Sequence, residues 1–420
     1  MKNLNHHSIL LIVTVIAAAL LLSACGIISQ ATASAENATA VLSSGGAGVT
    51  SAAAGNAYEE AFSDRDLSGD YDTAGSAAIL LNGTTATTSS EAVQVSGGTV
   101  TITAGGTYVL SGTLENGSII VNVSKDDKVQ LVLDGASIHS ATFAAIYVVQ
   151  ADKVFITLED GSVNTLSNGG SYAQIDDNDV DAVVFAKDDI TFNGNGTLRI
   201  TAEDGSGIVG KDEVTIASGV YEITAAKHAI RAKDSLAIAD GSFTLSASED
   251  GLHAENSDDE SLGNLYIAGG SFVITVGDDA IHANTLLQID GGTFNITAAE
   301  GLEATYIQIN GGSIQISASD DGVNAARKSS LYTPTFEMND GTLTIVMGAG
   351  DTDGIDSNGN IVVNGGTIDV TGQSPFDYDG TAQFNGGTII VNGQQVDSIP
   401  NQMMGGGAGG MGGGAGGRRP

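Results

Sequence analysis

The sequence predicts an all-β fold, a parallel β-helix built from coils of about 21–22 residues. Segments such as "VTIASGVYEITAAKHAIRAK", "LYIAGGSFVITVGDDAIHAN" and "LQIDGGTFNITAAEGLEAT" align on their glycines and form a repeat. Each segment holds two or three short runs of alternating apolar and polar residues, separated by Gly, Asp or Asn turns, as β-strands do. A unit of this length leaves no room for a helix, so we expect each short strand to stack on the same strand of the next coil.

The spacing of the repeat follows from the aliphatic residue after each acidic turn. Neighbouring copies lie 21 or 22 residues apart, except in two longer units of 29 and 32 residues. The extra residues, "ENSDDESLGN" and "ARKSSLYTPT", follow the same strand in both units, so both insertions should emerge on one edge. Weaker copies extend the predicted β-helix over residues 77–399. The aliphatic positions are Ile230, Leu252, Ile281, Leu302, Val323 and Ile355.

Three segments outside the repeat have a different composition. Residues 57–76, "AYEEAFSDRDLSGDYDTAGS", are expected to cover the first open edge of the β-helix. Residues 25–56 are mostly Ala, Ser, Thr and Gly, which is typical of a flexible tether. Residues 400–420 are rich in Gly, and we expect them to form a disordered tail.

Residues 1–24 have the pattern of a bacterial lipoprotein signal peptide. Lys2 precedes the apolar run "SILLIVTVIAAALLL", which is too short to span a bilayer comfortably. The following "LSAC" resembles a lipobox and implies lipidation of Cys25. We therefore expect an exported protein at the bacterial cell envelope or surface, whose contact with the membrane is the lipid anchor alone. An ordinary secretory signal with a chance cysteine is the alternative.

The composition restricts the possible partners. The chain has 50 acidic and 15 basic side chains and a formal net charge of −35, so it should repel nucleic acid. Hydrophobic residues make up 41% of the chain, which argues against a wholly disordered acidic protein. Cations, or an anionic ligand bridged by cations, remain natural partners. With one Cys, no disulfide can form within the chain, and we expect a monomer.

Acidic residues recur at the same turn of successive coils and predict a calcium site. Parallel strands stack about 4.8 Å apart, where two carboxylates repel by about 3 kcal/mol at an effective dielectric constant near 20. Calcium relieves such repulsion because it takes carboxylate oxygens at about 2.3–2.6 Å. The alternative is a solvated acidic face whose Asp residues only form turns. The candidate calcium ligands are Asp181, Asp204, Glu249, Asp250, Asp278, Asp279, Glu300, Asp320, Asp321, Asp353 and Asp356.

Basic and imidazole side chains interrupt this acidic column. Lys227 and Arg231 belong to one coil, "AAKHAIRAKD", and His253 and His282 occupy equivalent positions in the next two coils. These four residues are the candidate carbohydrate-binding residues. Zinc is not expected, because no Cys is available and only two histidines stack. In a lyase, Lys227 or Arg231 could remove a proton beside a calcium-bound uronate. Neutralisation of neighbouring carboxylates is the simpler role for both.

Several phrases resemble a known family. "FSDRDLSGDYD", "GTYVLSGTLENGSIIV" and "ITFNGNGTLRITAEDGSGIVGKDEVTIASG" are similar to segments of the bacterial carbohydrate-binding domain family, over about residues 60–395. The resemblance implies a right-handed, single-stranded parallel β-helix that is secreted or surface-held. It further implies binding of acidic plant polysaccharide, polygalacturonate in particular, with calcium. The family is structurally similar to calcium-dependent pectate lyases, but the resemblance implies binding more than cleavage.

Together these features predict a cell-surface lipoprotein that binds polygalacturonate or pectin through calcium, without cleaving it. A pectate-lyase-like enzyme acting by β-elimination is the first alternative. Hydrolysis by paired Asp residues is less consistent with carboxylates that are spread over many coils. A structural or adhesive envelope protein that calcium only stabilises is the remaining alternative.

Overall fold

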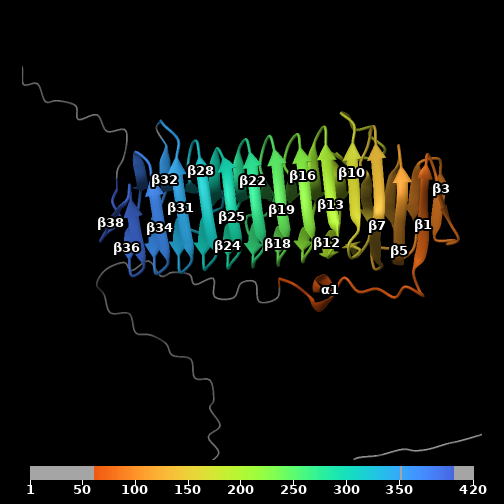
Figure 1. Cartoon of the computed structure of the whole chain (residues 1–420), viewed down its shortest axis with the longest axis horizontal. Helices are drawn as coiled ribbons and strands as arrows, with labels where there is room; N and C mark the ends of the chain where they lie inside the picture. The colour runs from red at the N-terminus through yellow and green to blue at the C-terminus, as the bar shows by residue number, and fades with distance from the viewer. Residues whose placement is uncertain (1–60, 351, 402–420) are drawn as a thin grey trace, which may run out of the picture. The chain divides into compact units, whose positions relative to one another are not determined.

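The computed structural model describes residues 61–350 and 352–401. More than half of these residues form strands of two long sheets, and consecutive coils stack in parallel along one axis (Figure 1). The expected all-β fold, a parallel β-helix, is confirmed. The expected signal peptide, Cys25 and tether lie outside the described residues, as do residues 57–60 and most of the expected tail. No helix of the described part is long and apolar enough to cross a membrane.

Each coil contributes one strand to a small sheet and two to a large sheet. The small sheet has 13 strands, of which all but the first pair run parallel. Its strands are β3 (Val93–Ser96), β4 (Thr99–Ile102), β6 (Ser118–Asn122), β8 (Ile146–Gln150), β11 (Ala182–Ala186), β14 (Ser206–Gly210), β17 (Ile230–Ala232), β20 (Leu252–Ala254), β23 (Asp279–Ala283), β26 (Glu300–Ala304), β29 (Val323–Ala325), β32 (Asp353–Ser357) and β35 (Ser374–Tyr378).

The large sheet has 25 strands and bends around the axis, so it forms two faces. Its first face comprises β9 (Lys153–Leu158), β12 (Asp189–Gly194), β15 (Glu213–Ile216), β18 (Ser235–Ile238), β21 (Asn264–Ile267), β24 (Leu286–Ile289), β27 (Tyr306–Ile309), β30 (Thr335–Met338), β33 (Asn360–Val363) and β36 (Ala382–Phe384). Its second face comprises β10 (Val163–Asn168), β13 (Thr197–Ala202), β16 (Val220–Ala225), β19 (Ser242–Ala247), β22 (Ser271–Val276), β25 (Thr293–Ala298), β28 (Ser313–Ala318), β31 (Thr342–Met347), β34 (Thr367–Thr371) and β37 (Thr388–Val391).

The remaining strands complete the two ends of the large sheet: β1 (Ala77–Gly83), β2 (Ala86–Thr88), β5 (Gly106–Leu114), β7 (Lys128–Ser140) and β38 (Gln394–Val396). Strands β1 and β2 pair antiparallel at one end, and β37 and β38 pair antiparallel at the other. These hairpins break the parallel pattern that another coil would continue, which protects the helix from edge-to-edge association.

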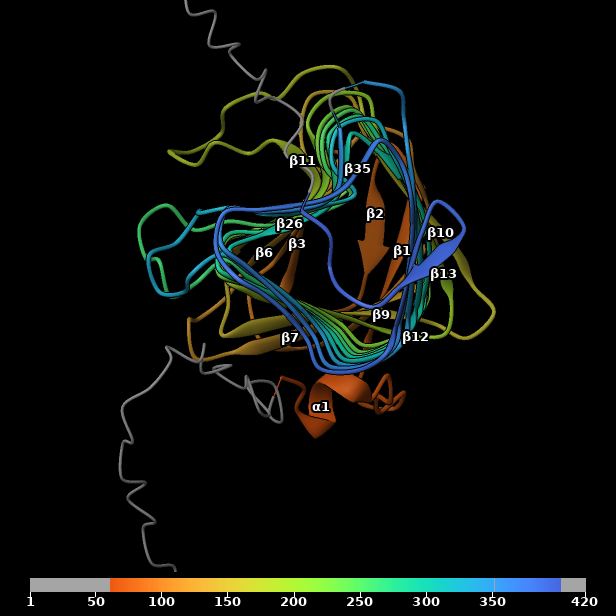
Figure 2. The same ribbon diagram turned by 90° about the vertical axis from the view of Figure 1, so that its left-hand side faces the viewer.

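Like residues stack on like residues inside the helix. In the small sheet, Leu252 pairs with Ile230 on one side and Ile281 on the other, and all three are fully buried. On the second face, the rings of Phe243 and Phe272 lie 4.6 Å apart, with an angle of 3° between their planes. The repeat therefore winds in register, as its spacing predicts. End-on, successive coils superpose into one closed outline (Figure 2).

One glycine of each corner pair has a backbone that other residues rarely adopt. Gly292 has a φ of 102°, and an added Cβ would lie 3.0 Å from the Gly270 carbonyl oxygen of the coil below. The conformation and the close stacking both require Gly at this corner.

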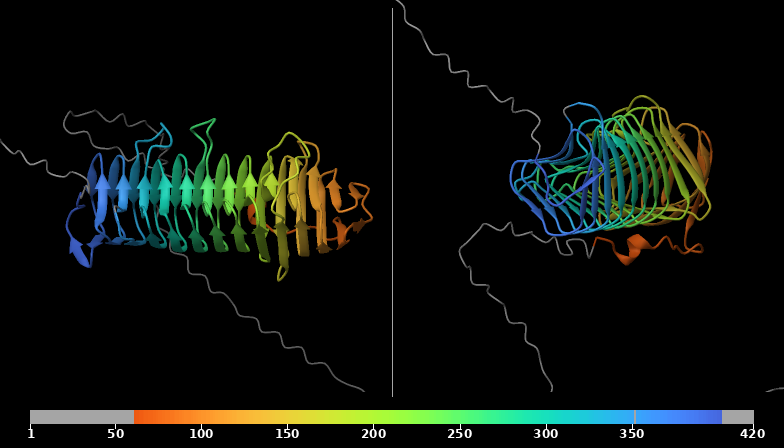
Figure 3. Two further views of the ribbon diagram at one scale, coloured as in Figure 1. Left: turned by 90° about the horizontal axis from the view of Figure 1, so that it is seen from above. Right: turned by 60° about the vertical axis from the view of Figure 1, so that its left-hand side comes forward.

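The two insertions emerge on the same edge, between the small sheet and the first face (Figure 3), and hydrogen bonds join them. The Ser330 amide donates to Glu260 Oε2 at 2.9 Å, and the Ser329 hydroxyl donates to the Glu260 carbonyl at 3.0 Å. These contacts tie coils that are 69–70 residues apart in sequence. The tied insertions flank the small sheet.

The segment before the repeat lies elsewhere than the sequence analysis placed it. The short helix α1 (Asp64–Leu67) lies against the first face, and the open end of the first coil is left to the β1–β2 hairpin (Figure 2). Asp66 of α1 pairs with Lys153 Nζ at 2.8 Å and accepts a bond from the Thr191 hydroxyl at 2.6 Å. The expectation of an edge cover at residues 57–76 is therefore corrected for its described part. The composition of this segment does not indicate that it packs against the side of the β-helix.

Candidate metal and carbohydrate site on the small sheet

The outer face of the small sheet carries one column of polar side chains. In β20, Leu252 and Ala254 are in the core, so His253 between them points outward. The same alternation holds in neighbouring strands. Cross-strand pairing places the outward residues one above the next in the order Arg231, His253, His282, Glu303, Asn324, Asp356 and Asp377.

A second column lies at the turn before each of these strands. Asp279 pairs with Glu300, and its amide donates to Asp250 Oδ1 at 3.0 Å. Further along, the Asp353 amide donates to Asp321 Oδ1 at 3.1 Å. The carboxylates thus bind the backbone of the next coil as well as facing each other. This turn column contains His228, Asp250, Asp279, Glu300, Asp321 and Asp353.

Five of the expected calcium ligands lie in neither column and precede the turn column: Asp181, Asp204, Glu249, Asp278 and Asp320. Ala182 pairs with Ser206, so Asp181 stands one position earlier, and its Oδ2 lies 3.7 Å from Lys227 Nζ. Asp204 also precedes the turn column, and its carboxylate accepts a bond from the amide of Gly205. Neither residue belongs to a group of metal donors in the described chain. The loop before β11 shifts the alignment by one residue, and no repeat in that loop allows the shift to be predicted from sequence.

The two columns border a hollow of about 430 Å³. It brings together seven residues expected from the sequence and four that were not among the candidates. Those four include Lys328, which comes from the second insertion. The lining residues are His228, Arg231, Asp250, His253, Glu255, Asp278, Asp279, His282, Glu300, Glu303 and Lys328.

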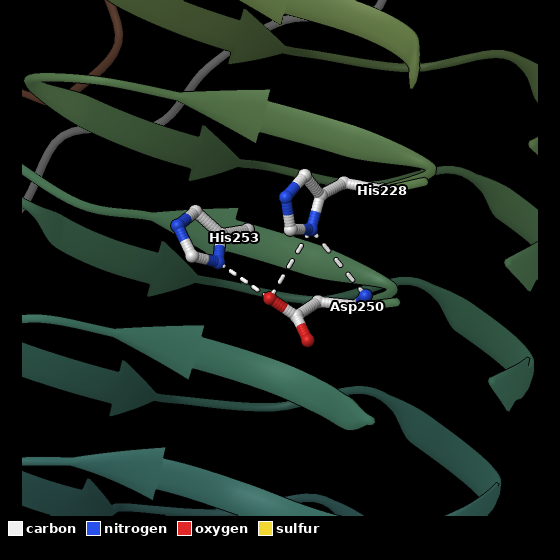
Figure 4. A group of neighbouring side chains, drawn as sticks. All are labelled: His228, Asp250 and His253. Atoms are coloured by element: carbon white, nitrogen blue, oxygen red, sulfur yellow. Dashed lines mark hydrogen bonds and ion pairs between the residues drawn. The ribbon is translucent and has the colours of Figure 1, made fainter. Parts of the chain in front are cut away.

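The first part of the hollow is built around Asp250 (Figure 4). His253 Nδ1 lies 2.5 Å and His228 Nδ1 3.2 Å from the same oxygen, Asp250 Oδ2. Burial would raise the pKa of Asp250, but the hydrogen bonds with the two imidazoles hold it well below its ordinary value. The two imidazole rings have their centroids 4.6 Å apart and are tilted by 34° to each other. Sequence alignment places His228 in this column, but only its side-chain direction shows that it reaches Asp250.

The middle of the hollow is charge-compensated. His282 Nδ1 lies 2.8 Å from both Asp279 Oδ2 and Glu303 Oε2, and Lys328 Nζ lies 2.7 Å from Glu303 Oε1. Burial opposes a charged imidazole, yet these two carboxylates raise the pKa of His282 to about 10. His282 is therefore an imidazolium at neutral pH. Together with Lys328 it balances Asp279 and Glu303.

Beyond His282 and Lys328, the columns contain acidic residues that have no basic ion-pair partner among the described residues. Burial, followed by neighbouring carboxylates, raises the pKa of Glu300 to about 8 and that of Asp321 to about 7. Burial and the charges of Asp353 and Asp377 raise the pKa of Asp356 to about 6. Among residues 61–350 and 352–401, no Lys, Arg or His forms an ion pair with Glu300, Asp321 or Asp356. A bound cation would supply the missing positive charge.

Three groups of donors in the described residues are close enough to hold a metal ion. Within each group, one donor atom per residue lies within 4.8 Å of the others. One group, Asp279 with Glu300 and Glu303, consists of carboxylates alone, which suits a hard cation such as calcium. The other two contain imidazole. They are His228 with Asp250 and His253, and Asp250 with Asp279 and His282.

A basic hollow of about 300 Å³ adjoins the first one and shares Arg231 and Glu255 with it. Lys211 and Lys233 also line it. Burial and the nearby Arg231 guanidinium lower the pKa of Lys211. Cations are thus concentrated at one end of an otherwise acidic surface.

Beyond the basic hollow, the outward column becomes apolar. Tyr147, Phe185 and Val209 are buried there, beneath the loop that contains Tyr172 and Val180. This cover ends the polar groove on that side.

Comparison with known proteins identifies the family. A family model described as carbohydrate-binding domain-containing protein matches residues 96–352 and 300–398. A carbohydrate-binding domain-containing protein of Acetivibrio thermocellus is 38% identical over 117 residues, which are 27% of this chain and 41% of that protein. A solved structure of a polysaccharide lyase-like protein from C. thermocellum, a gadolinium derivative, matches with a TM-score of 0.51 and 30% identity. That match covers 57% of this chain and 94% of the solved one. The chain belongs to the carbohydrate-binding domain-containing protein family.

Proposed function

We propose that the protein binds an acidic polysaccharide of the polygalacturonate type through calcium, and does not cleave it. The observation that carries this proposal is the run of acids without an ion-pair partner, Glu300, Asp321 and Asp356. It lies beside Asp279 and Glu303, whose charges His282 and Lys328 balance. Buried carboxylates whose pKa values approach or exceed neutrality are destabilised as anions, and a calcium ion between coils would stabilise them.

The polymer would contact calcium and protein cations together. A chain of net charge −35 repels a polyuronate unless divalent ions lie between the two sets of carboxylates. Arg231, whose planar guanidinium suits bidentate carboxylate binding, borders both hollows and could take a uronate directly. The outer column runs in register over several coils, which suits an extended polymer.

Binding without cleavage fits the basic residues better than β-elimination does. A proton-abstracting base must be free to accept a proton at the reacting carbon. Lys227 instead lies 3.7 Å from Asp181, away from the acids Glu300 and Asp321. Arg231 lies beside the imidazole end of the column, across from His253. The neighbouring cations favour electrostatic contact with a uronate.

The proposal includes the protein's location. A lipid on Cys25, after removal of the signal peptide at residues 1–24, would hold the binding domain at the bacterial cell envelope.

Co-sedimentation with insoluble polygalacturonate tests the proposed function. We expect retention with calcium, release by chelator, and no retention on fully methyl-esterified pectin, in which the uronate charge is removed. Retention that survives chelation would contradict the calcium bridge. Growth of the ultraviolet absorbance of an unsaturated product would show a lyase instead.

A charge-matched pair of variants sharpens this experiment. The double variant Glu300→Gln/Asp321→Asn removes two carboxyl groups from the column, and Glu222→Gln/Asp369→Asn removes two from the second face. Simple repulsion predicts that either variant binds the anionic polymer more tightly. Calcium bridging predicts that the column variant alone loses binding.

A further inference from the structure

We infer that His228, Asp250 and His253 form a separate site for a borderline transition-metal ion of the zinc and copper class. This inference does not depend on the proposed function. It also revises the expectation from sequence that zinc has no site here, because a third histidine, His228, lies beside His253 and shares the Asp250 carboxylate with it.

The donor atoms converge on one point. Both Nδ1 atoms approach Asp250 Oδ2, at 2.5 Å from His253 and 3.2 Å from His228 (Figure 4). Ligands of a tetrahedral zinc ion, bound at about 2.0–2.1 Å, lie roughly 3.3 Å from one another. The His228 contact is already near that separation, and the His253 contact needs to widen by less than about 1 Å.

The far side of each ring carries a carboxylate partner. His228 Nε2 lies 3.0 Å from Glu249 Oε2, and His253 Nε2 lies 3.3 Å from Glu255 Oε2. Histidines that bind metals through one nitrogen usually donate the other N–H to a carboxylate, which fixes the tautomer and the ring orientation. Both histidines have this arrangement.

The hydrogen-bonding capacity of the two rings also favours a metal ion beside the Nδ1 atoms that face Asp250. A neutral imidazole has one donor and one acceptor nitrogen, whereas a carboxylate offers acceptors only. Each ring here faces carboxylate oxygens with both nitrogens. His228 Nδ1 also accepts a long hydrogen bond of 3.4 Å from the Asp250 amide, which a metal ion would replace. A neutral imidazole at His253 has a single N–H for its two carboxylate neighbours, so a metal ion between Nδ1 and Asp250 Oδ2 would give the remaining lone pair a partner.

The bridging carboxylate is also held in place. Asp250 Oδ1 accepts the Asp279 amide at 3.0 Å, which leaves Oδ2 to face the two rings. Asp250 and His253 are only 4% and 6% exposed. Stacking of His253 on His282, at 4.6 Å and 13°, further restricts the ring. The site is therefore largely preorganised, and its three donor residues line the hollow of about 430 Å³.

The donor set separates this site from the calcium site. Two imidazole nitrogens and one carboxylate oxygen suit zinc, copper or nickel, whereas calcium prefers six to eight oxygens. The neighbouring group around His282 is less suitable, because its Nδ1 already contacts two carboxylate oxygens at 2.8 Å. The structure thus favours a borderline ion at Asp250 and a hard ion beyond Glu300.

Zinc titration of the full chain by calorimetry, in excess calcium, tests the site. We expect wild-type protein to bind one more zinc ion than His228→Ala/His253→Ala. The control is His139→Ala, whose imidazole contacts Ser167 on the second face; it should keep that ion. His6 and His7 are present in all three proteins, so any zinc they bind cancels in the comparison. Cobalt substitution should give visible ligand-field bands in wild type that the double variant lacks.

Two further variants keep the test decisive if the double variant misfolds. Asp250→Asn keeps an oxygen for the Asp279 amide and should lose the same zinc ion. Glu255→Gln should weaken zinc by about 10- to 100-fold, the usual effect of an outer hydrogen-bond partner. Equal zinc stoichiometry in wild type and Asp250→Asn would overturn the inference. Displacement of that zinc by calcium would also overturn it, because it would identify a hard-cation site.

Discussion

His253 stacks on His282 on the outside of the β-helix as closely as Phe243 stacks on Phe272 inside it. The ring centroids are 4.6 Å apart in both pairs. The same register therefore packs the core and assembles the functional columns. Substitutions in the core should therefore lower the stability of the fold. Substitutions in the columns should instead change ligand binding.

Truncation within the phenylalanine stack should destabilise the fold. Phe272 is 1% exposed and lies between Phe243 and Phe294, with centroids 4.6 and 4.5 Å away. We expect Phe272→Ala to lower the free energy of unfolding by about 3–5 kcal/mol, measured by urea denaturation. Val273, the next residue along β22, is 46% exposed, so Val273→Ala should change it by no more than about 0.5 kcal/mol. An equal loss of unfolding free energy in both variants would show that the phenylalanine stack does not stabilise the core.

The acidic columns should make the calcium-free protein less stable as the pH rises. Glu300, Asp321 and Asp356 have folded-state pKa values of about 8, 7 and 6, above their ordinary values. Between about pH 5 and 8 the folded state thus binds more protons than the unfolded state, so stability falls with rising pH. His282, with its pKa raised to about 10, acts in the same direction above its ordinary value. Asp250, whose pKa is lowered, costs stability only at strongly acid pH.

Thermal denaturation in chelator at a series of pH values measures this dependence. We expect the melting temperature to be higher at pH 5.5 than at pH 8, and calcium to reduce the difference. Asp321→Asn should also reduce it. A melting temperature that rises between these pH values in chelator would contradict the raised pKa values.

The contact between α1 and the first face should depend on Asp66. This residue is 3% exposed, pairs with Lys153 and closes a capping box with Ser63. Asp66→Ala leaves the Lys153 ammonium without its partner, and we expect a local loss of about 3–5 kcal/mol. Hydrogen exchange at the α1 amides should accelerate accordingly. Asp64→Ala, on the exposed side of α1, is the control and should leave exchange nearly unchanged.

Arg231 should contribute to polymer binding and not to calcium binding. We expect Arg231→Ala to weaken retention on polygalacturonate by about 10-fold, equivalent to about 1.4 kcal/mol, and Arg231→Lys to be intermediate. Arg199→Ala removes the same charge from the second face, where Arg199 pairs with Glu222, and should have little effect. If the two alanine variants weaken binding equally, Arg231 acts only through net charge.

The repeat allowed the coils and the outward column to be predicted from sequence, because stacked coils demand like residues at equal spacing. His253 and His282 could be aligned in this way, and cross-strand pairing confirms their position. Contacts made by insertions could not be predicted. Lys328 comes from an insertion without periodicity, and only the folded path brings it to Glu303.

The same limit applies to the position of α1 and to Asp181. Asp66 and Thr191 are 125 residues apart, and no repeat relates them. The loop before β11 likewise hides the one-residue shift that moves Asp181 out of the turn column. The sequence also could not show that His228 and His253 share Asp250, since that depends on side-chain direction.

Equilibrium dialysis with radioactive calcium at neutral pH tests the central claim most directly, because it counts bound ions without the polymer. The compared proteins are wild type, Glu300→Gln/Asp321→Asn and Glu222→Gln/Asp369→Asn. We expect the column variant to bind at least one calcium ion fewer than wild type, while the variant on the second face binds the same number. Identical calcium binding by all three proteins would contradict a calcium site on the acidic columns of the small sheet.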